Sequence, residues 1–440
     1  MLLFFILGLS CNTYSKTDSF DASEHVPLDI ESVALELDLA SLQGLAKMTL
    51  RSSREYVYLN SETLIIHSVS VDGTERRFLQ DNGFLSFKPN TGHVDNIVEV
   101  EISYSFPERN PQQFDGWIPD LGLSFIWPDH CGNLYPCHPD TRDGIEFSVD
   151  VSGIPEGWVA IHAQDVVPEA PPYMPAIAIG DYTQMQVGTT TSGIEVLAWY
   201  LDGEAGATDA YLGVQNMVQS IDFMEETYGP YAFGDRIGTV EVNWGMDSYG
   251  GMEHHPFFHV GHMDFWNEET QIHEVAHGWF GNAVRLECWE DFVLSEGTVT
   301  YMTARTLEQV AGEDLWAYYV DYFLEPICQG GVNNTVVMPE GCNELDFENS
   351  SLWSLATYMK GACFYEELGD ILSPEVLDSH ISEFYNNYTY RSARMEDMIE
   401  HILMNSSPEQ QERIEQSVFD WLQSSECPVD YANRCRFRNP

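Results

Sequence analysis

The chain has 440 residues, 44% of them hydrophobic, and 19 Lys and Arg against 70 Asp and Glu give a formal net charge of -51. This length can bury a large core and favours two or three domains over one. The negative charge makes binding to nucleic acid or to an anionic lipid surface unfavourable. Because 13% of the residues are aromatic and no acidic tail is present, we expect a folded acidic protein, either simply secreted or adapted to a saline habitat.

An apolar run opens the chain. Residues 1–10 read MLLFFILGLS and end at Cys11, after which residues 12–23 are polar. The run is too short to span a bilayer as a helix, so we interpret it as the end of a secretory signal. The sequence Leu-Gly-Leu-Ser-Cys also resembles a bacterial lipoprotein cleavage site, in which Cys11 would be acylated. Residues 1–23 are therefore predicted to be a signal or lipoprotein-like segment and linker, and the protein to be secreted or held in the bacterial cell envelope.

Eight cysteines remain beyond Cys11, and an even number in an exported chain indicates disulfides. Sequence does not determine their connectivity. Short loops favour the pairs Cys131–Cys137, Cys328–Cys342 and Cys427–Cys435, which leaves Cys288 with Cys363. The chain has no CxxC pair, so we expect no cysteine zinc site.

Residues 30–188 alternate apolar and polar positions, as in Val33–Leu39 and Ile97–Tyr104, with turn signals such as Asp72-Gly73 between the runs. This period of two predicts the strands of an antiparallel sandwich. We therefore expect an N-terminal β domain over residues 24–198.

Helical periodicity replaces this pattern after Tyr200. The expected elements are helices over 207–228, 268–280, 291–310, 352–368 and 395–404, and a strand over 237–244. Residues 199–440 are predicted to form a second, mainly helical domain with a small edge sheet, which makes the chain an α+β multidomain protein.

The strongest chemical signal is His273-Glu274-x-x-His277. On a helix the two imidazoles lie on one face and can bind one ion. A catalytic zinc site needs a third protein ligand and an open position, and Glu296 on the next predicted helix can complete it. Bound zinc lowers the pKa of water toward about 7. Glu274, beside the metal, is the expected general base.

Together with other motifs, this pattern resembles the gluzincin aminopeptidases of the aminopeptidase N (alanyl aminopeptidase) type. The spacing from HExxH to Glu296 and the surrounding WxDxxLxEG-like run both match that family. Tyr358-Met-Lys-Gly361 matches its YxKG motif, and Gly250-Gly-Met-Glu-His254 matches GxMEN except at the last residue. Leu134–Asp140 is similar to the Pro-Cys-x-Asp segment of its β domain. The resemblance covers about residues 30 to 430.

The resemblance implies a thermolysin-like catalytic domain with one zinc ion per chain and peptide substrates with a free N-terminus. It implies that Tyr358 stabilises the transition state, that Glu253 binds the substrate α-amino group, and that Gly251 and Met252 line the substrate strand. Because the chain stops at Pro440, it also implies a short form without the large helical C-terminal domain.

Two residues depart from the family pattern. His254 replaces an asparagine, and the place of a second amine-binding Gln or Glu falls near Trp127, where only Asp129 could substitute. The same zinc chemistry is compatible with an endopeptidase that has an open cleft. An inactive envelope peptide-binding protein is a further alternative.

A second metal site among His254, His255, His259 and His262 is the less favoured interpretation of the histidine-rich stretch, because in a strand these residues divide between two faces. The sequence does not indicate the oligomeric state.

Overall fold

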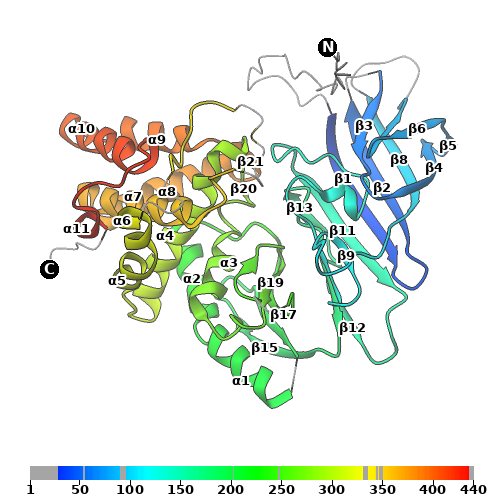
Figure 1. Ribbon diagram of the computed structural model, residues 1–440, viewed down its shortest axis with the longest axis horizontal. Helices are drawn as coiled ribbons and strands as arrows, with labels where there is room; N and C mark the ends of the chain where they lie inside the picture. The colour runs from blue at the N-terminus through cyan, green and yellow to red at the C-terminus, as the bar shows by residue number, and fades with distance from the viewer. Residues whose placement is uncertain are drawn as a thin grey trace, which may run out of the picture.

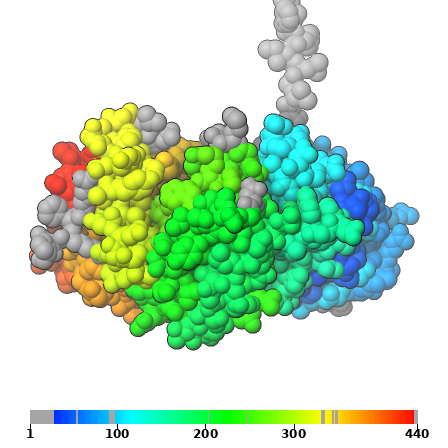
Figure 2. Space-filling model, turned by 90° about the horizontal axis from the view of Figure 1, so that it is seen from below, coloured from blue at the N-terminus to red at the C-terminus, as the bar shows by residue number. Residues whose placement is uncertain are grey.

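The computed structural model describes residues 28–52, 55–89, 96–201, 203–245, 248–330, 335–342, 345 and 350–435. The expected signal or lipoprotein-like segment, with Cys11, lies outside these residues. Strands from the N-terminal part gather on one side of the molecule and helices from the C-terminal part on the other (Figure 1). In the space-filling view, residues from the middle of the chain, coloured green, join the two sides (Figure 2).

A seven-stranded sheet dominates the N-terminal part, in the order β13-β11-β1-β2-β8-β4-β5. Every second residue of β2 is buried, as the period-two pattern predicts. The sheet is antiparallel except that β11 pairs with β1 in parallel. Its strands are β1 (Leu28–Asp38), β2 (Gln43–Ser52), β4 (Ile65–Val71), β5 (Thr74–Glu75), β8 (Asn96–Ser105), β11 (Ile145–Ser152) and β13 (Val167–Ala170).

Two smaller sheets complete this part, in the orders β3-β7-β6 and β12-β14-β10-β9. The predicted turn at Asp72-Gly73 joins β4 to β5, and both residues have positive φ, as a tight hairpin turn of this kind requires. The strands of these sheets are β3 (Val57–Asn60), β6 (Phe78–Asp81), β7 (Phe84–Phe87), β9 (Gly116–Ile118), β10 (Leu123–Phe125), β12 (Val159–His162) and β14 (Ile177–Gly180). A 3-10 turn, η1 (Cys131–Asn133), follows β10.

A five-stranded sheet lies next to the helices, in the order β15-β16-β17-β19-β18. Its strands are β15 (Thr183–Thr189), β16 (Glu195–Tyr200), β17 (Arg236–Val242), β18 (Gly251–Met252) and β19 (Phe257–Gly261). The expected boundary at residues 198/199 falls inside β16, which pairs with β17. That boundary stays a prediction.

Helices form most of the remaining chain. They are α1 (Gly203–Val214), α2 (Met217–Thr227), α3 (Glu268–Ala276), α4 (Phe292–Val310), α5 (Trp316–Tyr318), α6 (Glu325–Gly330), α7 (Leu355–Leu372), α8 (Pro374–Tyr388), α9 (Met395–Met404), α10 (Pro408–Ser417) and α11 (Tyr431–Arg434). Shorter elements are the 3-10 turn η2 (Trp289–Asp291), the π-helical turns η3 (Tyr319–Leu324) and η4 (Val418–Gln423), and the strand pair β20 (Val284–Leu286) and β21 (Arg391–Ala393). Among the described residues, no helix combines the length and the apolar composition that crossing a membrane requires.

Helix α4 is central, since all its residues from Phe292 to Leu307 are buried. A helix buried on all sides carries little amphipathic signal, yet its position was predicted within one residue. The helix expected over 207–228 is two helices, α1 and α2, separated near Asn216.

Four disulfides connect the eight described cysteines. Cys131–Cys137 forms as predicted. The other three predicted pairs, Cys328–Cys342, Cys427–Cys435 and Cys288–Cys363, are wrong. The observed pairs are Cys288–Cys342, Cys328–Cys427 and Cys363–Cys435. The predictions favoured partners close in sequence, whereas the three observed bridges join cysteines that are 54, 99 and 72 residues apart. For Cys363–Cys435, the contact of α11 with α7 explains the pairing.

Removal of the Cys328–Cys427 bridge is expected to lower the free energy of unfolding by about 2–4 kcal/mol, because its partners are 99 residues apart and the bridge restricts a long loop of the unfolded chain. Urea unfolding of the double Cys→Ser variant measures this. Removal of Cys131–Cys137, whose partners are six residues apart, is the control with a smaller expected loss. Equal losses for the two variants would contradict the loop-length argument.

Candidate active site

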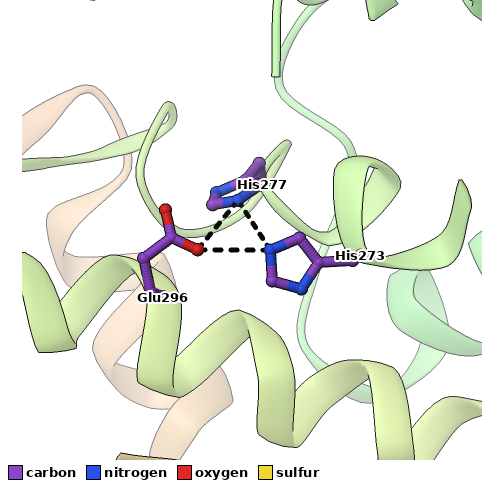
Figure 3. A group of neighbouring side chains, drawn as sticks. All are labelled: His273, His277 and Glu296. Carbon is purple, nitrogen blue, oxygen red and sulfur yellow. Dashed lines mark hydrogen bonds and ion pairs between the residues drawn. The ribbon is translucent and has the colours of Figure 1, made fainter. Parts of the chain in front are cut away.

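The three predicted zinc ligands meet at one point. His273 Nε2 lies 3.2 Å from Glu296 Oε2 and 3.3 Å from His277 Nε2, and His277 Nε2 lies 3.5 Å from the same Glu296 oxygen. Figure 3 shows the two rings, from α3 and the turn that follows it, directed toward the carboxylate of α4. Ligand atoms around a tetrahedral zinc ion are about 3.3 Å apart, so this triangle has the size that zinc requires.

The local sequence explains why α3 begins where it does. Asn267 caps the helix, since its side chain accepts a hydrogen bond from Glu269 N at 3.2 Å. Glu268 and Glu269 lie in the first turn, where negative charge is favourable. His273 and His277 then follow one turn apart on the face that meets α4.

Hydrogen bonding leaves the metal-facing nitrogen of His277 free to bind an ion. Its Nδ1 lies 3.1 Å from the carbonyl oxygen of Phe280, and the ring nitrogen that donates to a carbonyl must carry the proton. Nε2 is therefore the nitrogen that can offer a lone pair to an ion in the triangle, once the ion displaces the proton that Glu296 holds there. Two imidazoles and a carboxylate are ligands that suit zinc, so the residues present fit this metal.

The electrostatics also favour positive charge here. Burial raises the pKa of Glu296, but the charge of His277 and hydrogen bonds from both histidines lower it more, to about 2. Burial lowers the pKa of His277, but Glu296 raises it more, to about 10. His277 and Glu296 therefore hold a proton tightly between them. The same negative potential would stabilise a divalent metal ion bound in its place.

Two motif glycines set the distance between α4 and α7. A Cβ at Gly297 would come within 2.8 Å of the Gly361 Cα, and a Cβ at Gly361 within 2.6 Å of the Gly297 Cα. The two helices can cross this closely only because both positions lack a side chain. Their crossing brings Glu296, beside Gly297, to Tyr358, one turn before Gly361.

Tyr358 stacks on the ring of His273 with centroids 5.9 Å apart. Burial and the nearby carboxylates, Glu296 first among them, raise the pKa of Tyr358 well above its usual range. The hydroxyl therefore keeps its proton and can donate a hydrogen bond at the ligand triangle.

Two charged residues of the same motifs have structural roles. Lys360 is buried and donates to the carbonyl oxygens of Thr335 at 2.8 Å and Ser424 at 2.7 Å. Asp291 accepts from the backbone N–H of Met395 at 3.0 Å, which ties the start of α4 to the start of α9. These residues hold the helices that carry the site.

Glu274 is 4% exposed, and its Oε2 has no hydrogen-bond partner. Burial raises the pKa of Glu274 well above its usual range, and the carboxylates of Glu253 and Glu296 raise it further against the opposing effect of His277. A buried carboxylate with an unpaired oxygen is a strong base and is placed to exchange protons.

The stretch with Gly251 and Met252 is the edge strand β18, which pairs antiparallel with β19. A Cβ at Gly251 would lie 2.5 Å from the carboxyl carbon of Glu274. Only glycine lets this strand approach α3, which carries the predicted zinc ligands, so closely. The glycine of the GxMEN-like motif therefore has a packing role beside any contact with substrate.

Substitution of Gly251 by Ala is expected to lower kcat/KM by up to about 10²-fold, because the added methyl group must displace either Glu274 or the edge strand by about an ångström. Zinc content should not change. The matched control is Gly250→Ala, where an added Cβ meets no atom within 4 Å although the backbone is strained. Equal activity of the Gly251→Ala variant and the wild type would contradict the packing argument.

Glu253 accepts a hydrogen bond from a residue that the sequence did not predict to lie at the site. The Tyr173 hydroxyl, from the N-terminal part, donates to Glu253 Oε1 at 2.9 Å. Asn282 Nδ2 donates to the Glu253 carbonyl oxygen at 2.9 Å. One oxygen atom each from Glu253 and Glu274 lies within 4.8 Å of the other and of a His277 nitrogen. Glu253 thus lies next to the ligand triangle and is not part of it.

The four other histidines of this stretch do not form a group that could hold a metal. His255 bridges the Tyr231 hydroxyl, at 2.8 Å, and the carbonyl oxygen of Glu274, at 2.7 Å, and so supports α3. His262 lies against Glu241, and His254 packs edge-on against the rings of His259 and Phe125.

Asp129, the residue suggested as a second anchor for the substrate amine, lies outside the cleft. Asp129 accepts a hydrogen bond from Trp289 Nε1 at 3.4 Å and does not line the cleft. Trp127 packs against Trp353 at 5.4 Å between ring centroids. Among the described residues that line the cleft, Glu253, Glu274 and Glu296 are the only carboxylates.

Both parts of the chain line the cleft. The N-terminal part contributes Pro128, Thr141 and Tyr173. The predicted catalytic, substrate-binding and metal-binding residues are accompanied on the other side by Gly281, Leu286, Trp289, Phe292, Ser295 and Trp353. The site therefore lies where the β-rich part meets the helices.

Known proteins resemble this chain in sequence and in fold. Residues 215–421 match the model of the peptidase family M1 domain. The chain is 27% identical over 310 residues to leucine aminopeptidase 2 of Aspergillus niger, covering 61% of this chain and 48% of the relative. It is 25% identical over 310 residues to endoplasmic reticulum aminopeptidase 2 of Homo sapiens, covering 63% of this chain and 32% of the relative. The chain thus aligns with half or less of the length of these two relatives.

A solved structure shows the same fold over nearly the whole chain. It is a mutant M1 zinc metallopeptidase from Deinococcus radiodurans bound to a Tyr-Ser-Ala substrate, with a TM-score of 0.74 and 16% sequence identity. The likeness covers 91% of this chain and 95% of that one. These comparisons confirm the resemblance found in the motifs: residues 215–421 match a peptidase family M1 domain, as an aminopeptidase N-type gluzincin should.

Proposed function

We propose that this protein is a zinc aminopeptidase that removes N-terminal residues from peptides, with one zinc ion per chain in the catalytic site bound by His273, His277 and Glu296. One observation carries the proposal. Glu253 places a third carboxylate in a buried cleft that already holds Glu274 and Glu296. Buried carboxylates need cationic partners, and the ammonium group of a free N-terminus can pair with Glu253.

The peptide is held by residues of the edge strand. Glu253, kept in place by Tyr173, binds the α-ammonium group, and Gly251 and Met252 lie along the peptide backbone. This anchoring fixes the first peptide bond next to Glu274. Orientation of this kind can supply much of the barrier reduction.

Bound zinc would act as a Lewis acid that makes water more acidic and polarises the scissile carbonyl. Glu274 accepts a proton from the attacking water as the oxygen bonds to the carbonyl carbon. Tyr358 donates a hydrogen bond to the oxygen on which negative charge develops. Glu274 then gives its proton to the leaving nitrogen as the C–N bond breaks, and the amino acid and the shortened peptide are released.

We also propose export, with residues 24–198 as the β domain and 199–440 as the catalytic domain. Four disulfides are typical of an oxidising compartment. Lipid attachment at Cys11 is the finer form of this proposal. Mass spectrometry of the protein purified from its native membrane fraction would test it.

A pair of peptides that differ only at the N-terminus tests the proposed activity. The free peptide should be cleaved about 10²-fold faster than its N-acetylated counterpart, because acetylation removes the charge that Glu253 binds. A chelator should abolish both reactions, and zinc should restore them. Equal cleavage of the two peptides would favour an endopeptidase. Binding without turnover in zinc-loaded protein would favour a peptide-binding protein.

A further inference from the structure

A second cluster of metal-binding side chains lies outside the catalytic cleft, at the contact between α8 and α9. His380 and Glu383 are three residues apart on α8 and share one face of that helix. His401 lies in the last turn of α9 and faces them. One ligand atom from each of the three lies within 4.8 Å of the other two.

The arrangement resembles that of the catalytic histidines. The rings of His380 and His401 are 5.7 Å apart at an interplanar angle of 82°, compared with 4.9 Å and 80° for His273 and His277. In both places a carboxylate completes the group. Here His401 Nε2 lies 3.5 Å from Glu383 Oε2.

The histidines also have unused nitrogens. His380 is 8% exposed, and its Nδ1 is buried without a hydrogen-bond partner. His401 Nε2 is likewise buried and makes no hydrogen bond, despite its closeness to Glu383. A buried ring nitrogen without a partner is costly, and binding a cation through such a nitrogen would remove that cost.

We propose that His380, Glu383 and His401 form a second binding site for zinc, or for a divalent transition metal of similar ligand preference, that joins α8 to α9. Two imidazoles and one carboxylate provide three ligands, and water takes the fourth position. Glu383 is 61% exposed on its side chain, so its carboxylate can turn toward the ion and the site exchanges metal with solvent. The site is therefore weaker than the buried catalytic one.

Zinc titration of the metal-free full-length protein tests this. The titration is done in excess magnesium, which occupies carboxylate-only sites and competes poorly for imidazole. Wild type should bind two equivalents of zinc, the second more weakly. His401→Ala should lose the second equivalent, and Glu383→Gln should weaken it, while His67→Ala, which changes an exposed histidine of the distant seven-stranded sheet, should bind both.

Cobalt provides a readout that does not depend on activity. In a protein whose catalytic site is already filled with zinc, added Co²⁺ should give the visible absorption of a tetrahedral complex, and His401→Ala should abolish it. Binding of a single equivalent by wild type would overturn the proposal. So would a second equivalent that persists in the His380→Ala, His401→Ala double variant, because the metal would then lie elsewhere. Neither result depends on whether peptides are hydrolysed, so the proposed activity is tested separately.

Discussion

Replacement of Glu274 by Gln is expected to reduce kcat by about 10²- to 10⁴-fold while zinc remains bound, which is the range that general acid–base catalysis supplies. The amide keeps the shape of the side chain but cannot accept the proton of water or return it to the leaving nitrogen. Glu274 is not one of the three ligands of the triangle, and its Oε2 has no other partner. Steady-state kinetics with an amino-acid amide and metal analysis of the same sample measure both effects.

Glu268 provides a matched control on the same helix. It is also buried, but its carboxylate binds the backbone N–H of Asn216 at 3.1 Å and the side chain of Gln215 at 3.2 Å. Glu268→Gln should lower the free energy of unfolding and leave kcat almost unchanged. If Glu274→Gln kept full turnover, or lost its zinc, the assignment of Glu274 as general base would fail.

The meeting of the three proposed zinc ligands could be predicted from sequence because helical geometry determines which residues share a face. His273 and His277 meet for this reason alone, and Glu296 follows from the family resemblance. The structure shows why Glu296 can reach the two histidines. Gly297 and Gly361 let α4 and α7 cross closely enough to bring Glu296 and Tyr358 to the histidines.

Tyr173 could not be predicted in the same way. It lies 80 residues before Glu253, between strands of the β-rich part, and no local pattern connects the two. Three of the four predicted disulfide pairs were wrong for a related reason. Cys328 and Cys427 are 99 residues apart in the chain, and spacing along the sequence does not show that such distant residues meet in the fold.

The fold was predictable where patterns are periodic. Alternation along β2 and the apolar face of α9 gave the correct element types, whereas the π-helical turn η3 was not anticipated. The parallel pairing of β11 with β1 was also missed, because alternation reveals that a strand has one buried face and says nothing about its partner.

Replacement of Glu253 by Ala is expected to lower kcat/KM for a free peptide by about 10²-fold and to leave cleavage of an N-acetylated peptide almost unchanged, because only the free peptide carries the charge that the carboxylate binds. Tyr173→Phe should have a smaller effect, about tenfold, since it removes one hydrogen bond to a charged group and keeps the carboxylate. The ratio of the two kcat/KM values isolates the anchor from general damage, because a disturbed cleft would slow both peptides alike. An equal loss for both substrates would show that Glu253 supports the edge strand and does not select the amino terminus.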